Sequence, residues 1–358
     1  MSDDFFKDLK VIELASVLAG PSVGLFFAEQ GAQVLKIENK KTGGDVTRSW
    51  KLPTENPESS VSAYFSSVNY KKRYLNLDLS DQNDYQCLIK ELIQADVLIT
   101  NFKKGDDKKF KLDYATLKQI NPRLIYGEIT GYGSDSDRVA YDLILQADSG
   151  FMFMNGTPDS GPVKMPVALI DLLAGHQLKE GILVALINRM KSNKGCKVSV
   201  SLFESALASL ANQASNWLME KHNPKPIGSK HPNIAPYGDI YTTADKKLVT
   251  LAIGNDKQFL LLCDSLNLSS LNFDVRFASN QNRVKNRIEL EKLLQEKILC
   301  FSADELMHVL LEKKIPGAVI KTVEEVFNDP KASALINEEI IDGKETKRLK
   351  TVVYRITQ

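Results

Sequence analysis

A single aspartate stands immediately before a strongly apolar helical stretch. Asp171 precedes Leu172–Leu178, where an acidic residue is typical of a helix N-cap. The position also suits covalent chemistry, because a helix dipole favours an ionised carboxylate and such a carboxylate can attack an activated acyl group. His176 lies roughly 140° further around the helix, so it forms no dyad with Asp171. The sequence leaves both roles of Asp171 open.

Two glycines interrupt the same helical stretch. Gly175 and Gly181 each weaken a helix by about 1 kcal/mol relative to alanine. We expect another backbone or a ligand to approach the helix closely at these positions.

Two loops carry clusters of basic residues. Asn69–Arg73 precedes a predicted strand, whereas Asn101–Lys109 follows one. Ligands of doubly wound sheets bind beyond the carboxyl ends of strands, so the second loop is suited to a phosphate-bearing ligand. Solvated lysines on loops are the ordinary alternative for each cluster. Because the formal net charge is only +1, any anion site must be local.

A turn of small residues, Leu14–Pro21, joins a predicted strand to a helix. Such a turn brings backbone N–H groups toward an anion. It lacks the GxGxxG pattern, and Pro21 removes one donor, which argues against a nicotinamide-binding enzyme. The alternative is a plain strand–helix turn with proline at the first helical position.

Strand-like and helix-like stretches alternate over the first part of the chain. This alternation predicts an α/β protein with a doubly wound parallel sheet. The predicted strands are Lys10–Leu14, Gln33–Ile37, Tyr74–Asp78, Asp96–Thr100, Leu124–Ile129 and Lys197–Leu202. The predicted helices between them are Val23–Gln30, Gln82–Gln94 and Leu172–Met190.

A smaller α+β domain is expected after this region. We expect the large domain to cover residues 1–222, completed by about 326–358, and the small domain to cover 223–325. Leu202–Lys221 predicts one long helix, followed by a proline-rich crossing. Further predicted elements are a hairpin at Tyr241–Ile253, helices at Lys257–Leu266, Arg283–Cys300 and Ala303–Lys313, and a strand at Lys350–Ile356 that returns to the large domain.

The composition is that of an ordinary globular protein, with 43% hydrophobic and 25% charged residues. Its near-neutral charge gives no global attraction to nucleic acid or acidic membranes. The four cysteines form no CxxC pair, so we expect neither a metal site nor disulfides. No signal-peptide pattern or membrane-spanning apolar run occurs. We therefore expect a cytoplasmic protein with no nucleic-acid or membrane partner.

Several motifs follow one another in order along nearly the whole chain. The first part contains LAGP, GAQVLKIE and GGDVTR. The middle contains ADVLITNFKKG, NPRLIYGEITGYG and AYDLILQADSG. The remainder contains DLLAGHQLKEGILVALINR, GCKVSVSLFESAL, HPNIAPYGDIYTT and IPGAVIKTVEEVFNDP. In this order the motifs resemble the family III CoA-transferases, the group of formyl-CoA transferase and carnitine CoA-transferase.

The resemblance implies an enzyme that moves CoA between an acyl-CoA and a free carboxylic acid. Asp171 would attack the thioester to form a mixed anhydride, and the CoA thiolate would return to give an aspartyl-CoA thioester. An acceptor carboxylate would complete the exchange. Coenzyme A is then a substrate, with no permanently bound cofactor. The implied fold is a Rossmann-like large domain with a smaller α+β domain, in an interlocked homodimer.

The same motifs imply site residues. Tyr141 is expected beside the acyl group, as a second catalytic residue after Asp171. CoA is expected to contact Val17, Leu18, Ala19, Asn69, Lys72, Asn101, Phe102 and Lys109.

The chain departs from the family pattern at several positions. Leu18 stands where oxalate-using members have glutamine, and Asn39 replaces an arginine that binds CoA in some relatives. HPNIAP occupies the place of a glycine-rich lid, and whether the His231–Pro232 segment replaces that lid stays open. The chain stops soon after Ile356, without the C-terminal tail that most relatives carry, and the effect on the dimer's C-terminal packing and on part of the substrate pocket stays open. The donor and acceptor acids are not identified.

Two other functions stay open. An α-methylacyl-CoA racemase shares the implied fold but needs two opposed proton-transfer groups. Racemases carry histidine where this chain has Tyr141, and a phenol is a poor base near neutral pH. Asp256 falls near the racemase glutamate, which keeps this alternative. The third possibility is a CoA-binding protein without turnover.

Overall fold

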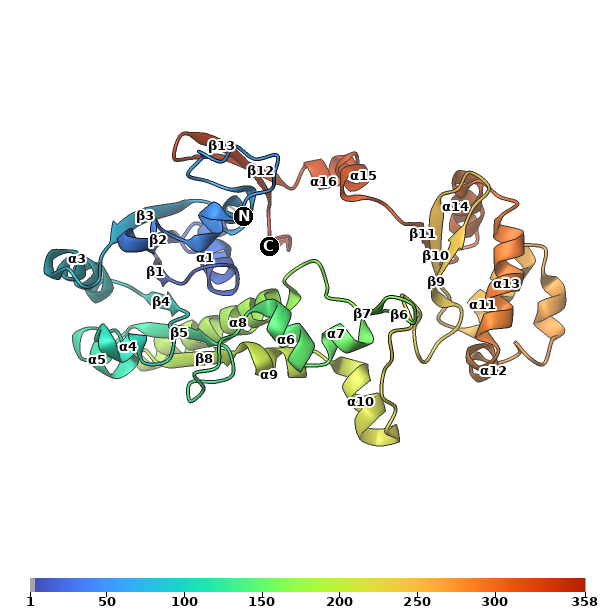
Figure 1. Cartoon of the computed structure of the whole chain (residues 1–358), viewed down its shortest axis with the longest axis horizontal. Coiled ribbons are helices and arrows are strands. Elements are labelled where there is room, and N and C mark those ends of the chain that lie inside the picture. Colours follow the sequence, from blue (N-terminus) through green and yellow to red (C-terminus); the bar gives the residue numbers. More distant parts are fainter. Residues whose placement is uncertain (1–3, 358) are drawn as a thin grey trace. The chain divides into compact units, whose positions relative to one another are not determined.

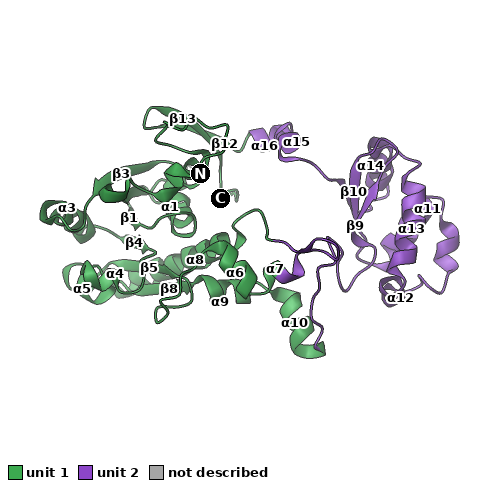
Figure 2. Cartoon of the chain, viewed as in Figure 1, with its two compact units in different colours: residues 1–152, 164–220, 334–358 green, residues 153–163, 221–333 purple. Residues whose placement is uncertain are grey.

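The computed structural model describes residues 4–357 of the chain. The chain divides into two compact units (Figure 2). The first consists of Met1–Met152, Lys164–Glu220 and Ala334–Gln358, and the second of Phe153–Val163 and Lys221–Ser333. Separate hydrophobic clusters form the cores of the two units.

A six-stranded parallel sheet forms the centre of the first unit (Figure 1). Its strands are β1 (Lys10–Leu14), β2 (Gln33–Asn39), β3 (Lys72–Leu77), β4 (Val97–Thr100), β5 (Ile125–Thr130) and β8 (Lys197–Ser201). Their order is β3-β2-β1-β4-β5-β8, and every neighbouring pair is parallel. This is a doubly wound sheet whose switch point lies between β1 and β4. The predicted parallel sheet is confirmed.

Helices cover both faces of this sheet because successive strand residues point to opposite faces. Val11 and Ile99 pack with α1 and α8, whereas Ile12 and Leu98 pack with α3 and α5. The helices of this unit are α1 (Ala19–Glu29), α2 (Ala63–Val68), α3 (Gln82–Ile93), α4 (Asp106–Lys109), α5 (Tyr114–Ile120), α6 (Asp142–Asp148), α8 (Leu169–Ser192), α9 (Leu202–Ala208) and α10 (Ala211–Glu220), with 3-10 turns η1 (Lys40–Thr42) and η2 (Val46–Ser49).

The two glycines of α8 mark sites of close packing. A Cβ atom at Gly175 would lie 2.3 Å from Ser22 Oγ and 3.0 Å from the Ala19 carbonyl oxygen. At Gly181 it would lie 2.6 Å from Val198 Cγ1. The predicted close approach is confirmed, and at Gly175 it brings the N-terminal parts of α8 and α1 together.

The single long helix predicted for Leu202–Lys221 is wrong. The segment forms two helices, α9 and α10, that separate after Ser209. The Ser209 hydroxyl donates to the Ser205 carbonyl oxygen at 2.8 Å. Ala211, the first residue of α10, has a φ of 50° in the left-handed region, and this backbone conformation interrupts the right-handed helix.

The C-terminal segment differs from the prediction in its local structure. Lys350–Ile356 is irregular rather than a strand, and the unpredicted hairpin β12 (Ile336–Ile341) and β13 (Lys344–Leu349) precedes it. The Val352 N–H donates to Glu29 Oε2 at 2.8 Å. This contact holds the segment against the end of α1.

The second unit contains a three-stranded antiparallel sheet in the order β11-β10-β9. The predicted hairpin is confirmed, whereas the predicted helix Arg283–Cys300 is broken at Asn286, which ends α12 and precedes α13. The remaining elements of the chain are α7 (Phe151–Met154), β6 (Gly156–Thr157), β7 (Gly161–Pro162), β9 (Tyr237–Thr242), β10 (Leu248–Ala252), α11 (Asp256–Ser265), η3 (Ser269–Phe273), α12 (Asn280–Lys285), α13 (Arg287–Ile298), α14 (Ala303–Glu312), β11 (Gly317–Val319), α15 (Val323–Phe327) and α16 (Pro330–Ser333). Among residues 4–357, no helix has both the length and the apolar character needed to span a bilayer.

Candidate active site

The loops that follow β1 and β4 meet at the switch point of the sheet. Asn101 Oδ1 accepts the Ser16 N–H at 3.1 Å, and Asn101 Nδ2 donates to the Ser16 carbonyl oxygen at 2.9 Å. Phe102 follows and packs partly against the core beside α3. Three of the residues expected to contact CoA, Val17, Asn101 and Phe102, therefore come from two loops that are bonded to each other. This edge is where doubly wound sheets bind ligands.

Val17 has a backbone conformation that is rare for a β-branched residue. Its φ is 72°, in the left-handed region, which costs on the order of 1–3 kcal/mol. Its N–H donates to the Asp45 carboxylate at 3.2–3.3 Å. Leu18 then forms the N-cap of α1 and offers no capping side chain. The first N–H groups of α1 consequently carry the positive end of the helix dipole.

Asn69 and Lys72 are buried within the first unit. Lys72 Nζ donates to Glu13 Oε2 at 2.8 Å, to the Pro21 carbonyl oxygen at 2.9 Å and to Asn69 Oδ1 at 3.1 Å. An ammonium has three donors, so all of those of Lys72 are used. All three of these contacts are with the protein, and the one to Pro21 links Lys72 to the first turn of α1.

Lys109 is the last residue of the second basic loop, Asn101–Lys109. It is the last residue of α4 and is exposed, with Nζ 5.2 Å from the centre of the Phe110 ring. The side chain of Lys109 lies at the surface, and its contact with CoA stays a prediction.

Asp171 does not occupy the N-cap position that the sequence favours. Helix α8 begins two residues earlier, with Ala168 as its N-cap. The cap comes instead from α6, because Asp142 Oδ1 accepts the Ile170 N–H at 2.7 Å. Asp171 is therefore the third residue of the helix, and its carboxylate is not engaged in capping.

The Asp171 carboxylate is poorly stabilised as an anion. The residue is 8% exposed, and no group within residues 4–357 donates a hydrogen bond to this carboxylate. Burial raises its pKa to about 7, and the nearby charge of Asp142 contributes. The helix dipole acts in the opposite direction, but burial prevails. Asp171 is thus a carboxylate of unusual basicity near neutral pH, which makes it more nucleophilic than an ordinary aspartate.

Tyr64 lies among the acidic residues of this site. Burial raises the pKa of its phenol to about 12, and the charges of Asp171, Asp142 and Asp45 contribute. The phenol therefore stays neutral and can donate a hydrogen bond. Its ring meets Trp50 edge-on, with centroids 5.2 Å apart.

A small apolar cluster joins the two parts of the site. Leu18, Leu25 and Val68 are buried, and Val17, Tyr70, Ala168 and Leu172 pack against them. Ala168 and Leu172 flank Asp171 in α8, while Val17 and Leu18 form the turn before α1. The turn before α1 and the first turn of α8 thus share one cluster.

The sequence interpretation missed three polar residues of this region: Tyr64, Asp45 and Asp142. Asp45 lies in GGDVTR and Asp142 in AYDLILQADSG, so the motifs contained the signal for two of them. Tyr141, the residue selected from the second motif, is 56% exposed at the N-cap of α6. The structure puts its neighbour Asp142, rather than Tyr141, in contact with the first turn of α8.

Comparison with protein families decides the class of this site. The model described as CoA-transferase family III matches residues 6–356. The chain belongs to this family. The resemblance seen in the sequence is confirmed, and the chain is an enzyme of the CoA-transferase class, whose members use CoA as a co-substrate.

Individual relatives cover most of the chain. It is 38% identical over 333 residues to the succinate–glutarate CoA-transferase of Agrobacterium fabrum, covering 91% of this chain and 82% of that protein. It is 34% identical over 327 residues to the succinyl-CoA:glutarate CoA-transferase of Mus musculus, covering 90% and 73%. Among solved structures, a CAIB/BAIF family protein from Brucella suis superposes with a TM-score of 0.82 at 37% identity, covering 97% and 91%. The fold thus extends through both units.

Proposed function

We propose that this CoA-transferase exchanges CoA between the thioester and the free form of short dicarboxylic acids, with Asp171 as the covalent carrier. The observation that carries the proposal is the buried carboxylate of Asp171, whose pKa burial raises to about 7. Such a carboxylate can exist as an anion at neutral pH while remaining a stronger nucleophile than a solvated one. The dicarboxylic substrates are supported by the relatives named for succinate and glutarate.

The exchange balances through two covalent forms of Asp171. Its carboxylate oxygen attacks the thioester carbonyl, the C–S bond breaks, and the CoA thiolate leaves a mixed anhydride. The thiolate then attacks the Asp171 carbonyl carbon, which frees the donor acid and forms an aspartyl-CoA thioester. The acceptor carboxylate attacks this thioester to give a second anhydride and thiolate. Attack of the thiolate on the acceptor acyl carbon yields the new acyl-CoA and restores Asp171.

The surrounding residues have roles that fit these steps. In the proposal, the turn at Val17–Ala19 with Asn101 and Phe102 binds CoA, and Lys109 contributes a cation for a phosphate. Tyr64, neutral below about pH 12, is suited to donate a hydrogen bond to an acyl oxygen. Burial of Asp171 keeps water from the anhydride and the thioester, which would otherwise hydrolyse.

Tyr141 and the two buried residues Asn69 and Lys72 also belong to the proposed site. Tyr141 is exposed beside Asp142, where it can contact the acyl group. Asn69 and Lys72 act on CoA indirectly in this proposal, through the start of α1, because Lys72 donates to the Pro21 carbonyl oxygen.

We also propose that the enzyme works as an interlocked homodimer in the cytoplasm. Helix α10 presents large apolar side chains, with Leu218 68% and Met219 77% exposed, and none of its residues is buried. Apolar side chains of this size gathered on one helix favour burial in a second copy. The cysteines of the described residues are free thiols, which agrees with a reducing compartment.

The experiment is CoA exchange by Asp171→Ala, with Asp148→Ala as control because Asp148 is a carboxylate of the same unit paired with Arg138. Succinyl-CoA is offered with a panel of mono- and dicarboxylic acids, and products are followed by mass spectrometry. We expect Asp171→Ala to lose at least about 10⁴-fold in kcat while still binding CoA, and Asp148→Ala to transfer CoA. Transfer by Asp171→Ala at the wild-type rate would refute the mechanism.

A second measurement, loss of α-deuterium followed by mass spectrometry, distinguishes the racemase alternative. Asp256 is ion-paired with the buried Arg283, Asp256 Oδ1 lying 2.5 Å from Arg283 Nη2, which disfavours it as a proton-transfer base. We expect no deuterium loss from the α-position of a 2-methylacyl-CoA. Rapid washout of that deuterium without CoA exchange would favour a racemase.

A further inference from the structure

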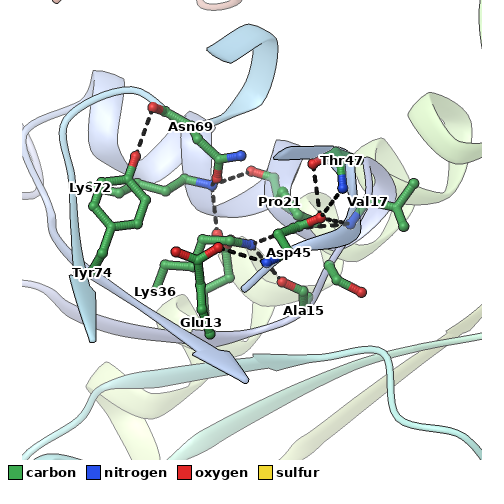
Figure 3. Close-up of polar contacts among 12 residues, drawn as sticks. Glu13, Ala15, Val17, Pro21, Lys36, Asp45, Thr47, Asn69, Lys72 and Tyr74 are labelled. Atoms are coloured by element: carbon green, nitrogen blue, oxygen red, sulfur yellow. Dashed lines mark hydrogen bonds and ion pairs between the residues drawn. The ribbon is translucent and has the colours of Figure 1, made fainter. Parts of the chain in front are cut away.

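Four charged side chains lie buried beneath the N-terminal half of α1 (Figure 3). Lys36 Nζ contacts Glu13 Oε1 at 2.9 Å, Asp45 Oδ2 at 3.0 Å and the Ala15 carbonyl oxygen at 2.7 Å. Lys72 Nζ contacts the other Glu13 oxygen at 2.8 Å. Two ammonium groups and two carboxylates balance in charge. We refer to Glu13, Lys36, Asp45 and Lys72 as the buried network.

The pKa values show which end of the buried network holds its charges most firmly. Burial lowers the pKa of Lys72 to about 8, since Glu13 only partly offsets it and Lys36 adds repulsion. Burial also opposes the charge of Lys36, but Glu13 and Asp45 together raise its pKa above the ordinary value. Burial likewise opposes the charge of Asp45, yet Lys36 and the Thr47 donors hold its pKa below the usual range. Lys36 and Asp45 therefore form a firmly charged pair.

Asp45 uses this fixed charge on the backbone of the β1–α1 turn. Its Oδ1 accepts the Thr47 N–H at 3.0 Å and the Thr47 hydroxyl at 2.8 Å, which orients the carboxylate. Both carboxylate oxygens accept the Val17 N–H, and Lys36 donates to the Ala15 carbonyl oxygen of the same turn. The left-handed conformation of Val17 is thus over-determined by its surroundings, as a strained residue requires.

The backbone of helix α1 packs directly against the buried network. A Cβ atom at Gly24 would lie 1.9 Å from Glu13 Oε2 and 3.4 Å from Lys72 Nζ. Only a glycine lets the helix backbone pass this close to the buried charges. The Pro21 carbonyl oxygen accepts from Lys72, so the network holds both the turn and the first residues of the helix.

We propose that Asp45 is a positioning residue of the CoA site, which holds Val17 in the left-handed conformation so that the N–H groups at the start of α1 face the incoming CoA. This inference rests on the proposed function, because it assigns the turn to CoA. It adds a role that the proposed function does not contain, because here the buried network sets the conformation of the β1–α1 turn as well as contributing to the core. A purely structural network would affect stability without affecting CoA affinity selectively.

The test compares Asp45→Ala with Glu29→Gln as a matched control. Glu29 is also a buried acid paired with an arginine, Arg348 Nη2 at 2.8 Å, but at the opposite end of α1. Binding of CoA is measured by calorimetry, and KM and kcat for succinyl-CoA are measured by exchange. We expect Asp45→Ala to weaken CoA binding and raise KM by about tenfold or more, with kcat changed less than about threefold. Glu29→Gln should keep KM within about twofold of wild type.

A second variant tests the backbone directly. Adding Val17→Gly to Asp45→Ala removes the steric cost of the left-handed conformation, and we expect it to recover part of the lost CoA affinity. If Asp45→Ala does not fold, Thr47→Val removes only the hydroxyl donor to Asp45 and should raise KM about two- to threefold.

Three results would overturn the inference: Asp45→Ala with wild-type CoA affinity, equal rises in KM for Asp45→Ala and Glu29→Gln, or wild-type KM for Thr47→Val where Asp45→Ala does not fold. Calorimetry keeps this outcome distinct from failure of the proposed function. Wild-type protein that binds CoA without exchanging it refutes the function but leaves the effect of Asp45 on binding measurable.

Discussion

The site contains two buried aspartates that differ in the charge of their neighbours and in the number of hydrogen bonds that their carboxylates accept. Asp45 is 5% exposed and Asp171 is 8% exposed. Lys36 and Thr47 satisfy Asp45, and its pKa lies below the usual range despite burial. Asp171 has Asp142 as its charged neighbour, and burial raises its pKa to about 7. The same side chain at similar depth thus has a lowered pKa in one place and a raised pKa in the other.

This difference teaches that burial alone does not identify a functional carboxylate. When a cation and N–H donors surround a buried carboxylate, its lone pairs are occupied, so its role is to fix the conformation of the groups bonded to it. A buried anion without such donors keeps its basicity, at a cost to folding stability. The two regions share the apolar cluster of Val17, Leu18, Ala168 and Leu172. In our proposal, the turn that Asp45 anchors therefore positions a substrate against Asp171.

The largest expected effect on stability is at Asp45. Asp45→Ala leaves Lys36 with Glu13 alone in a buried site, and removing one partner of a buried pair costs about 3–5 kcal/mol. Urea unfolding at pH 7 and fixed protein concentration measures this loss. A cost below about 1 kcal/mol would mean that the buried network is not firmly charged, which would weaken the contrast with Asp171.

Asp171→Asn should act in the opposite direction. The pKa of Asp171 is raised from 3.8 to about 7 in the folded protein, so folding favours the protonated form. The stability that this provides is fully present below about pH 4 and is lost as the pH rises through about 7. Asparagine does not ionise, and each pKa unit corresponds to about 1.4 kcal/mol, so the variant gains at most about 4 kcal/mol at pH 8 and almost nothing at pH 4.

Urea unfolding of Asp171→Asn and wild type at these two pH values measures the gain. Glu29→Gln is the matched control, because it also replaces a buried acid by its amide, but an acid that Arg348 and N–H donors satisfy. A loss of stability for Asp171→Asn at pH 8 would show that Asp171 is anchored like Asp45.

The smallest effect concerns the acid limb of the pH profile. A nucleophilic Asp171 must be ionised, so kcat/KM for acyl-CoA should rise with pH through about 7. Asp142→Asn keeps an oxygen to accept the Ile170 N–H but removes the neighbouring charge, so the midpoint should fall by less than about one pH unit. Asp148→Asn, at the other end of α6, should leave the midpoint unchanged. A midpoint unmoved by Asp142→Asn would leave burial as the whole cause.

Much of the fold was predictable because its signals are local. Each strand of the parallel sheet shows in the sequence as a short run rich in β-forming residues, and Gly175 and Gly181 indicated the close contacts of α8. The break after Ser209 was not predictable in this way, because no local pattern indicates the left-handed backbone conformation of Ala211. The hairpin β12–β13 was also not predicted, because its strands INEEII and KETKRL contain adjacent charged residues and show no regular apolar–polar alternation.

The motifs of the site could be predicted from the sequence, but the contacts among their side chains could not. Lys72 was selected for its charge, yet its ammonium donates to Glu13 and Pro21, both more than 50 residues earlier in the chain, and to the neighbouring Asn69. Asp142 caps α8 by accepting the N–H of Ile170, 28 residues further along the chain, and no periodicity indicates such a contact. Spacing makes Asp171 a plausible cap, and only three-dimensional burial makes it a basic carboxylate.

The most direct test of the account is to trap the acyl group on Asp171. The wild-type enzyme is incubated with succinyl-CoA and hydroxylamine, which converts an aspartyl anhydride or thioester into a hydroxamate, and peptides are analysed by mass spectrometry. The account predicts a hydroxamate at residue 171 that requires succinyl-CoA, with none at Asp45. An enzyme that exchanges CoA under these conditions without a modification at residue 171 would contradict it.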